Sequence, residues 1–553
     1  MESRMRRIVV VGGTAAGWTA AARLASVFGA TVSVAVLETP SSSAETSDTG
    51  LVSAVPSTLQ RELFDRLGVP EDEWMRACGA SFKTAVRYVN WRTEGGAETA
   101  RRMAGGGGVD HFYRPCAPLP ECEEFTLLEC WRHRRSSGET IEAFDYACFR
   151  EPPLMDAGKS PRWMDGRAAV PYAWHIDTRM FTAYLRNLAM RRFGVRAVRD
   201  ELLYAERDER GMLTVLHTVK SGTVAGDLFL DCTGGERLLL GGTLGEPFVD
   251  AHENLVCDSA VTVTLPREDA AHGIEPFTTV TALPNGWAWK MPLLGRFGAG
   301  HAYARDRTEP DEASSALREL CGPLPEGATV RHIDHRIGRS RRAWVKNCVA
   351  VGGAAFVLEP LADDGLGEVL HQMDRLVRDF PSHGDREAPA ARYNRAVRAR
   401  YDAARDLTRL RYALAPRRDT PFWTAVSELP LPDALRECLT AYRAGLSPDP
   451  AAHEVAYYCL LASLTTDRSA PRSALTHRPA ARRAAEARFL QIKRQQQILL
   501  ETLPTAQEYL YRLHTRPSPA VAVRRPDTGR PVGYAEHGRD ASRPPVPRPR
   551  AIR

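Results

Sequence analysis

The stretch from Arg7 to Trp18, RIVVVGGTAAGW, constrains the fold of this chain more than any other segment. Ile8 to Val11 form a β-branched run that is typical of a strand buried on both faces. The glycines Gly12, Gly13 and Gly17 follow, and small and apolar residues then recur at helical spacing over 19–28. The segment therefore predicts a strand, a glycine-rich turn and a helix in direct succession.

The same unit predicts a dinucleotide site. A second apolar run, Val32 to Leu37, ends in Glu38, about 20 residues beyond the turn, where dinucleotide folds place the carboxylate that binds the adenosine ribose. Free N–H groups at the helix start attract a pyrophosphate, and glycines let the backbone approach it. Thr14 stands where the G-x-G-x-x-G pattern has its second glycine. The alternative is a glycine-rich turn in an ordinary βαβ unit.

The composition is ordinary for a large globular enzyme. The 553 residues are 43% hydrophobic and 26% charged, with a net charge of +6. No basic stripe interleaved with aromatics indicates nucleic acid, no apolar run reaches the ~20 residues of a membrane span, and no His/Cys spacing predicts a metal. The eleven cysteines include no C-x-x-C pair. We therefore expect a cytoplasmic protein with reduced thiols and no signal peptide.

The order of strand and helix patterns predicts an interrupted α/β fold. Residues 81–91 alternate as one strand, and 177–193 form an amphipathic helix capped by Asp177. Residues 261–266, 278–282, 286–292 and 298–304 have the pattern of an antiparallel sheet, and Val349 begins a return to the first domain. We predict a Rossmann-like domain with an inserted sheet over 1–375, a helical part over 376–515 that completes the substrate cavity, and a disordered Pro/Arg-rich tail over 516–553.

Several separated segments, in order from residue 7 to about residue 514, resemble the flavin-dependent halogenases, the tryptophan-halogenase branch in particular. VVVGGTAAGWTA is similar to the family's flavin turn, ASFKTAVRYVNW to the segment with its essential lysine, and GWAWKMP to its hallmark W-x-W-x-I-P. FYRP, YAWHIDTRMFTAYL, LFLDCTGG and RIGRSRRAWVKNCVAVGGAAFVLEPLADDG resemble further segments. The resemblance implies an FAD domain of the flavin monooxygenase type, with FAD bound by Gly12, Gly13, Thr14, Ala15, Gly17, Glu38, Gly353 and Leu366.

The resemblance also implies the chemistry. Reduced FAD, supplied by a separate flavin reductase, O2 and chloride or bromide would yield hypohalous acid, and Lys83 would guide it to an electron-rich aromatic ring. The tunnel and substrate walls would be formed by Trp287, Trp289, Pro292, Phe112, Arg114 and Glu359. The alternatives are a surface lysine on a half-exposed strand and simple core packing of the two tryptophans.

The chain differs from the family's motifs at positions where the resemblance places catalytic, halide-binding and substrate-binding residues. The family's E-P-L-E-S-T-G is EPLADDG here, so its catalytic glutamate falls on Ala362 and its halide-contacting threonine on Asp364. The backbone N–H groups of Asp364 and Gly365 are the halide candidates, although the Asp364 carboxylate would repel an anion. The family's F-Y-H-P-F is FYRPC, which puts Arg114 at the histidine and Cys116 at an aromatic position.

These observations leave three functional hypotheses. The one we adopt is a halogenase-like FAD-dependent oxidoreductase that acts on an aromatic natural-product intermediate, small or carrier-bound, other than free tryptophan. The second is a flavin hydroxylation or oxidation without halide, in which Asp363 or Asp364 is the acid or base. The third is a non-catalytic binding protein with a degenerate flavin site. A homodimer is possible, and no metal is expected.

Overall fold

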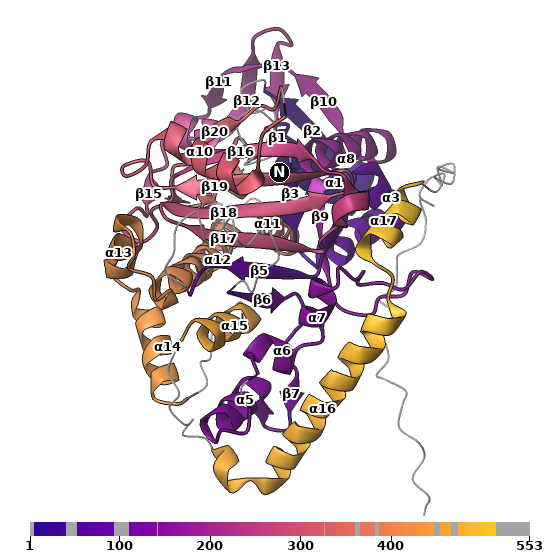
Figure 1. Ribbon diagram of the computed structural model, residues 1–553. Coiled ribbons are helices and arrows are strands. Elements are labelled where there is room, and N and C mark those ends of the chain that lie inside the picture. Colours follow the sequence, from indigo (N-terminus) through magenta and orange to yellow (C-terminus); the bar gives the residue numbers. More distant parts are fainter. Residues whose placement is uncertain are drawn as a thin grey trace, which may run out of the picture. The chain divides into compact units, whose positions relative to one another are not determined.

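A six-stranded sheet in the order β10-β2-β1-β14-β23-β22 forms the centre of the first part of the fold in the computed structural model (Figure 1). β1 (Arg7–Val11) lies between β2 (Ser33–Glu38) and β14 (Leu228–Asp231) and is parallel to both. β14 is parallel to β23 (Cys348–Ala350), so the chain does return to this sheet after the inserted segments. The edge strands are β10 (Arg196–Arg199) and β22 (Trp344–Val345). The predicted α/β fold is confirmed.

The structure describes residues 5–39, 52–92, 110–140, 142–325, 327–359, 365–381, 386–446, 454–465 and 474–515. The chain divides into two units, Met1–Pro517 and Ser518–Arg553. The tail predicted at 516–553 lies outside the described residues, as do Ala362, Asp363 and Asp364. Among the described helices, none has the length and apolar character to cross a membrane.

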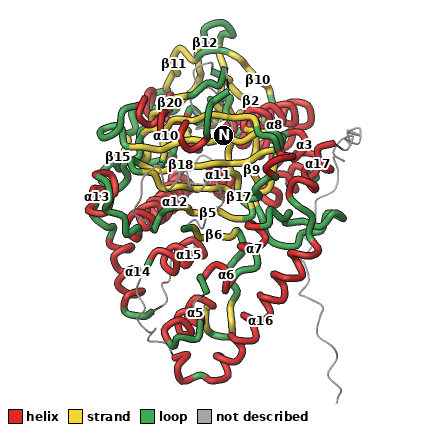
Figure 2. Tube along the Cα trace, viewed as in Figure 1, coloured by secondary structure: helices red, strands yellow, loops and turns green. Residues whose placement is uncertain are grey.

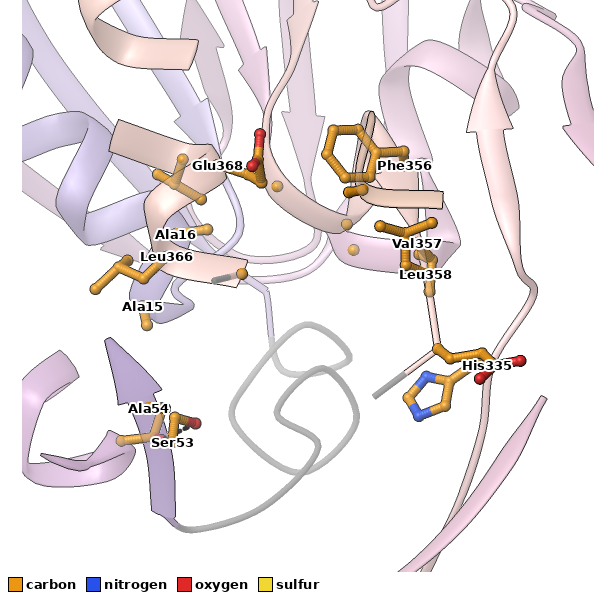
Figure 3. Close-up of a pocket in the computed structure, with 18 of the residues that line it drawn as sticks. Ala15, Ala16, Ser53, Ala54, His335, Phe356, Val357, Leu358, Leu366 and Glu368 are labelled. Atoms are coloured by element: carbon orange, nitrogen blue, oxygen red, sulfur yellow. Dashed lines mark hydrogen bonds between the residues drawn. The ribbon is translucent and has the colours of Figure 1, made fainter. Parts of the chain in front are cut away.

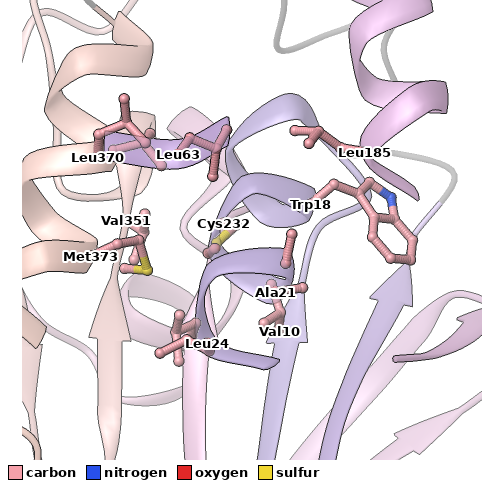
Figure 4. Close-up of a cluster of buried hydrophobic side chains, with 14 of the residues drawn as sticks. Val10, Trp18, Ala21, Leu24, Leu63, Leu185, Cys232, Val351, Leu370 and Met373 are labelled. Carbon is pink, nitrogen blue, oxygen red and sulfur yellow. The ribbon is translucent and has the colours of Figure 1, made fainter. Parts of the chain in front are cut away.

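Helix α1 (Ala15–Phe28) follows the first strand and packs against α8 (Thr178–Phe193) and α11 (Gly365–Arg378). Asp177 caps α8, as predicted, because its Oδ1 accepts the N–H groups of Arg179 and Met180 at 3.0 Å each. In Figure 4, side chains of β1, α1 and α11 meet in one buried cluster that includes Val10, Leu24 and Met373, each 0% exposed. Burial of each such side chain contributes about 1.5–3 kcal/mol.

The second large sheet has seven strands in the order β20-β16-β19-β18-β17-β5-β6. Its members are β20 (Arg331–Asp334), β16 (Ser259–Pro266), β19 (Arg296–Tyr303), β18 (Gly286–Leu293), β17 (Phe277–Leu283), β5 (Ala85–Val89) and β6 (His111–Pro115). The four strands predicted as an antiparallel sheet pair in that way. The sheet as a whole is mixed, because β5 lies parallel to β17.

Residues 81–91, predicted as one strand, form two strands in different sheets, so that prediction was wrong. β4 (Ser81–Lys83) pairs with β9 (Ala173–Asp177) in a small sheet that also contains β3 (Val52–Val55). Between β4 and β5, the Thr84 N–H donates to the carbonyl oxygen of Pro276 at 2.7 Å, and the Thr84 carbonyl accepts the Cys116 N–H at 2.9 Å. These bonds redirect the backbone, so Lys83 ends one strand at the crossing between two sheets.

The C-terminal part is helical, as Figure 2 shows, and touches both large sheets. It comprises α12 (Glu387–Leu414), α13 (Pro421–Glu428), α14 (Asp433–Arg443), α15 (Glu454–Leu464), α16 (Pro479–Thr502) and α17 (Ala506–Thr515). α12 contacts β22 of the first sheet, and α15 contacts β6 of the second. The remaining helices and strands are α2 (Asp65–Leu67), α3 (Glu71–Ala77), β7 (Glu121–Cys122), β8 (Phe125–Thr126), α5 (Leu127–Ser136), α6 (Phe144–Cys148), α7 (Glu151–Asp156), β11 (Leu202–Arg207), β12 (Leu213–Thr218), β13 (Thr223–Ala225), β15 (Phe248–Asp250), α9 (Asp269–His272), α10 (Pro310–Cys321), β21 (Gly338–Ser340) and β24 (Phe356–Val357).

Candidate active site

The turn between β1 and α1 requires glycine at two positions. Gly12 has a φ of +115°, and a Cβ there would lie 2.5 Å from the carbonyl oxygen of Cys232. A Cβ on Gly17 would lie 2.0 Å from the carbonyl oxygen of Gly12. Thr14, at the position of the missing glycine, caps α1 because its Oγ1 accepts the Gly17 N–H at 3.2 Å. Threonine at position 14 therefore lacks the backbone freedom of glycine but supplies a helix cap, and the turn stays close-packed.

Glu38 lies beside this turn at the end of β2. A Cβ on Gly13 would lie 3.0 Å from the Glu38 Cγ. Arg186 of α8 donates to both carboxylate oxygens of Glu38, at 2.8 and 3.3 Å. A carboxylate has about four acceptor positions, so a bidentate arginine leaves acceptors for a ribose hydroxyl while it fixes the orientation of the group.

A cavity of about 570 Å³ extends from this turn to the seven-stranded sheet (Figure 3). Its nucleotide side is lined by α1, by the turns after β14 and β23, and by the start of α11, through Ala15, Ala16, Gly234, Gly353, Gly365 and Leu366. Its opposite side is lined by the sheet and by α12, through Arg114, Trp289, Met291, Leu407, Thr408 and Arg411, and Glu359 also reaches it. Figure 3 shows Ala15 and Leu366 across the cavity from Leu358. The cavity thus joins predicted cofactor residues and predicted substrate residues.

The nucleotide side fits FAD by its shape and chemistry. The helix N-terminus at Ala15 and the glycine turns line it, and the Glu38 carboxylate lies beside it; these are the groups a dinucleotide needs, although Gly12, Gly17 and Glu38 are not among the described residues that line the cavity. The turns after β14 and β23 meet closely, since a Cβ on Gly353 would lie 3.1 Å from the Gly234 Cα. FAD would be held by Gly12, Gly17, Glu38 and Gly353.

The turn after β14 also lines the site, although it was not predicted among the site residues. Asp231 is 0% exposed, and its carboxylate accepts the Thr233 hydroxyl at 2.6 Å and the N–H groups of Leu239 and Leu240 at 2.9 and 2.8 Å. This network holds Thr233 and Gly234 on the cavity wall. A second strand that ends in a glycine turn, LFLDCTGG, was the available signal.

Two cross-strand rows of the seven-stranded sheet form the opposite wall. One row runs Phe112, Tyr88, Val280, Trp289, Gly300. Beside it on the same face, Arg114, Val86 and Thr278 lie in register, and so do Met291 and Gly298. Residues opposite one another in register point to the same face. The Trp289 indole lies over Gly300, where a Cβ would be 2.1 Å from the ring. Gly300 therefore makes room for the tryptophan on the cavity wall.

Trp287 lies one row further on the same strand. Its ring centroid is 5.5 Å from that of Trp289, so the two indoles share a face as the alternation predicts. Trp287 is 1% exposed and packs within the core of the helical part. Among the described residues, those that line the cavity include Trp289, Arg114 and Glu359 but not Trp287, Phe112 or Pro292.

Tyr412 of α12 connects this wall to Glu359. The Trp287 Nε1–H donates to the Tyr412 hydroxyl at 3.1 Å, and that hydroxyl donates to Glu359 Oε2 at 2.5 Å. Glu359 Oε1 accepts the N–H groups of Val256 and Cys257 at 2.8 and 2.9 Å. Burial raises the pKa of Glu359, while the Tyr412 hydroxyl opposes that shift. Glu359 therefore anchors the chain just before the predicted halide turn.

Lys83 is 4% exposed, which does not fit the alternative of a surface lysine. Ser81, two residues earlier on β4, donates its hydroxyl to the carbonyl oxygen of Pro292 at 2.5 Å. The Cys116 thiol donates to the carbonyl oxygen of Lys83 at 3.4 Å. Ser81 thus ties β4 to the end of the W-x-W-x-x-P strand, and Lys83 lies two residues further along β4; Lys83 is not one of the described residues that line the cavity. Within the described ranges, no three His, Cys, Asp or Glu side chains gather as a metal site.

Comparison with known proteins shows that the chain is similar to tryptophan halogenases. The tryptophan halogenase family model matches residues 7–474. The chain is 38% identical over 532 residues to tryptophan 6-halogenase ThaL of Streptomyces albogriseolus, covering 93% of this chain and 99% of that one. It is also 38% identical to tryptophan 7-halogenase RebH of Lentzea aerocolonigenes, covering 93% and 100%. Among solved structures, Tar14, a tryptophan C-6 flavin-dependent halogenase from taromycin biosynthesis, is similar with a TM-score of 0.83, 34% identity, and coverage of 92% and 99%.

Proposed function

The chain belongs to the tryptophan halogenase family, and from that premise we propose that it halogenates an electron-rich aromatic natural-product intermediate, with Lys83 guiding the oxidant. It is an FAD-dependent oxidoreductase of the halogenase type, in a family that uses a halide as co-substrate. When bound, reduced FAD and O2 supply the oxidising equivalents that make the halide electrophilic. We also propose that a separate flavin reductase delivers the reduced flavin.

The burial of Lys83 is the observation that carries this proposal. Lys83 is 4% exposed, on a strand that Ser81 ties to Pro292, so the lysine is screened from bulk water. A lysine ammonium has three donors on a flexible stem, which suits an oxidant that must be held and aimed. Screening from water also protects a reactive oxidant from loss before it meets the substrate.

The substrate proposal rests on two replacements, of which Arg114 lines the cavity and Cys116 is not among the described residues that line it. The relatives named above are tryptophan halogenases, and Arg114 and Cys116 stand where the resemblance expects a histidine and an aromatic. Arg114 lines the cavity, as Met291 does. A cation in place of a histidine changes which ring substituents the wall accepts, which supports an aromatic substrate other than free tryptophan.

Turnover of the full chain tests the proposal. FAD is titrated first, and a shift of the flavin absorption spectrum is expected on binding. The chain is then supplied with FAD, NADH, a flavin reductase, chloride or bromide, and a panel of indoles, phenols and pyrroles. The expected result is a product with the isotope pattern of chlorine or bromine. Oxygenated product without halogen would replace the proposal with hydroxylation, and an unchanged flavin spectrum would replace it with a non-catalytic binding protein.

A further inference from the structure

We infer that Arg186 of α8 is a cofactor-binding residue, which orients Glu38 for the adenosine ribose of FAD and receives the adenine ring on its exposed side. The inference concerns the binding of FAD, so it goes beyond the proposed function and does not depend on which reaction the chain catalyses. Arg186 directly follows the segment YAWHIDTRMFTAYL and was not among the predicted FAD residues.

The Glu38 carboxylate lies between the glycine turn and α8. Glu38 ends β2, and the Asp200 N–H donates to its carbonyl oxygen at 3.1 Å, which fixes its backbone. Its side chain packs on the turn, because a Cβ on Gly13 would lie 3.0 Å from the Glu38 Cγ. A carboxylate at this position binds the adenosine ribose in dinucleotide folds. The group that holds this carboxylate therefore also lies beside the adenosine half of the cofactor.

Arg186 holds the Glu38 carboxylate by two hydrogen bonds. Its Nε donates to Oε1 at 2.8 Å, and its Nη2 donates to Oε2 at 3.3 Å. Such a bidentate pair fixes the plane of the carboxylate as well as its position. The arginine also balances the charge of Glu38, which would otherwise repel the pyrophosphate that the start of α1 attracts. We therefore expect loss of the arginine to weaken FAD binding through Glu38.

The Trp18 indole of α1 packs against the same guanidinium group. Trp18 is 0% exposed, and the Arg186 Cζ lies 5.7 Å from its ring centroid. Figure 4 shows Trp18 and Leu185 in one buried cluster, so the residue before Arg186 anchors α8 at this point. The Arg186 side chain is 37% exposed, whereas that of Glu38 is 16% exposed. The guanidinium group is thus held by an aromatic ring and a carboxylate, and part of it remains accessible.

An accessible guanidinium group next to the ribose site suits a nucleobase. Arginine stacks its planar group on aromatic rings, and a purine presents such a face. Adenine is bonded to the ribose that Glu38 would bind, so it comes within reach of a group that already lies 2.8 Å from that carboxylate. Flavin mononucleotide has no adenosine half and would not meet Arg186. The arginine therefore favours FAD over the mononucleotide.

Binding of the two flavins tests this inference without turnover. The full chain, Arg186→Gln and Arg186→Lys are each titrated with FAD and with flavin mononucleotide and followed by flavin fluorescence. Arg186→Gln should weaken FAD binding about 10- to 100-fold, the range for a hydrogen bond to a charged group. Arg186→Lys keeps the charge but not the planar fork, so its loss should be smaller. Flavin mononucleotide should bind all three proteins within about twofold, or none of them.

Two further comparisons locate the effect. Arg191→Gln is the control, because Arg191 is an exposed arginine of the same helix, and it should leave the FAD affinity unchanged. In a Glu38→Gln chain, Arg186→Gln should cost less FAD affinity than in the unsubstituted chain, since the two residues act as a pair.

Four results would overturn the inference: no FAD binding by the unsubstituted chain, unchanged FAD affinity in Arg186→Gln, an equal loss for both flavins, or additive losses in the double variant. A chain that binds FAD in the expected way but halogenates nothing would leave the inference intact and refute only the proposed function.

Discussion

Replacement of Tyr412 by phenylalanine should lower the free energy of unfolding more than removal of a buried hydroxyl that makes a single hydrogen bond. Tyr412 is 0% exposed, and its hydroxyl both accepts the Trp287 Nε1–H at 3.1 Å and donates to Glu359 Oε2 at 2.5 Å. Tyr412→Phe leaves a buried indole N–H and a buried carboxylate oxygen without this partner. The hydroxyl also lies 3.4 Å from the Cys257 sulfur, and phenylalanine has no polar atom to replace that contact.

The expected loss follows from these two bonds. A hydrogen bond to a charged group contributes about 1.5–3 kcal/mol, and one between neutral groups about 1 kcal/mol. We therefore expect Tyr412→Phe to lower the free energy of unfolding by about 2–4 kcal/mol at neutral pH. Since the hydroxyl favours the charged form of Glu359, its loss raises the pKa of that group further. The penalty should accordingly be smaller at acidic pH, where the carboxyl binds a proton and needs no donor.

Urea unfolding, followed by tryptophan fluorescence, measures the effect. Tyr393→Phe is the matched control, since Tyr393 is also on α12, is 0% exposed, and donates one hydrogen bond, to the carbonyl oxygen of Ala350 at 3.0 Å. That control should lose about 1 kcal/mol. A Tyr412→Phe loss equal to or below that of Tyr393→Phe would refute the reasoning about a coupled buried network.

Three further changes test other parts of the structure. Gly12→Ala should abolish FAD binding in a fluorescence titration, because the new Cβ would lie 2.5 Å from the Cys232 carbonyl oxygen at a φ of +115°; Gly242→Ala, where a Cβ has no neighbour within 3.9 Å, should bind normally. Thr14→Ala removes the cap of α1 and should lower the free energy of unfolding by about 1 kcal/mol, whereas Thr14→Gly should cost only a few tenths. Burial lowers the pKa of His301 to about 4 from 6.5, so the unfolded chain binds the proton first, and this residue should contribute a loss of stability of about 2 kcal/mol between pH 7 and pH 5 in urea titrations; His335, whose pKa burial also lowers to about 4, adds to the same slope. His301→Phe should reduce the slope by the share of His301, and an unchanged slope would contradict the assignment to this residue.

Local patterns predicted the parts of the fold in which neighbouring residues determine the outcome. The run Ile8–Val11 and the capping residue Asp177 each specify an element that forms where predicted. The helix predicted over 19–28 also forms, but it begins at Ala15, because Thr14 caps it, so Gly17 lies in the helix and not in the turn. The alternation of Trp287 and Trp289 likewise fixed which face they share. Such features depend on periodicity and turn chemistry, which a sequence displays directly.

Contacts between distant segments could not be predicted in this way. Tyr412 and Arg411 lie on a helix, and helical spacing alone does not say that one meets Glu359 and the other lines a cavity with Arg114. The break at Thr84 was hidden for a similar reason, because the residues on both sides favour strands and the partners that separate them, Pro276 and Cys116, come from elsewhere in the chain. Substrate contacts arise mainly from such meetings, so the candidate site was predicted less completely than the fold.

The role of Lys83 is tested most directly by Lys83→Met, which keeps the length of a buried side chain and removes its amine. Flavin affinity and halogenated product per reduced FAD consumed are measured for both proteins on the best substrate of the panel. We predict unchanged FAD affinity, a melting temperature unchanged within a few degrees, and at least 100-fold less halogenated product. Product formation within a few-fold of the unsubstituted protein would contradict the account, since the oxidant would then reach the substrate without this amine.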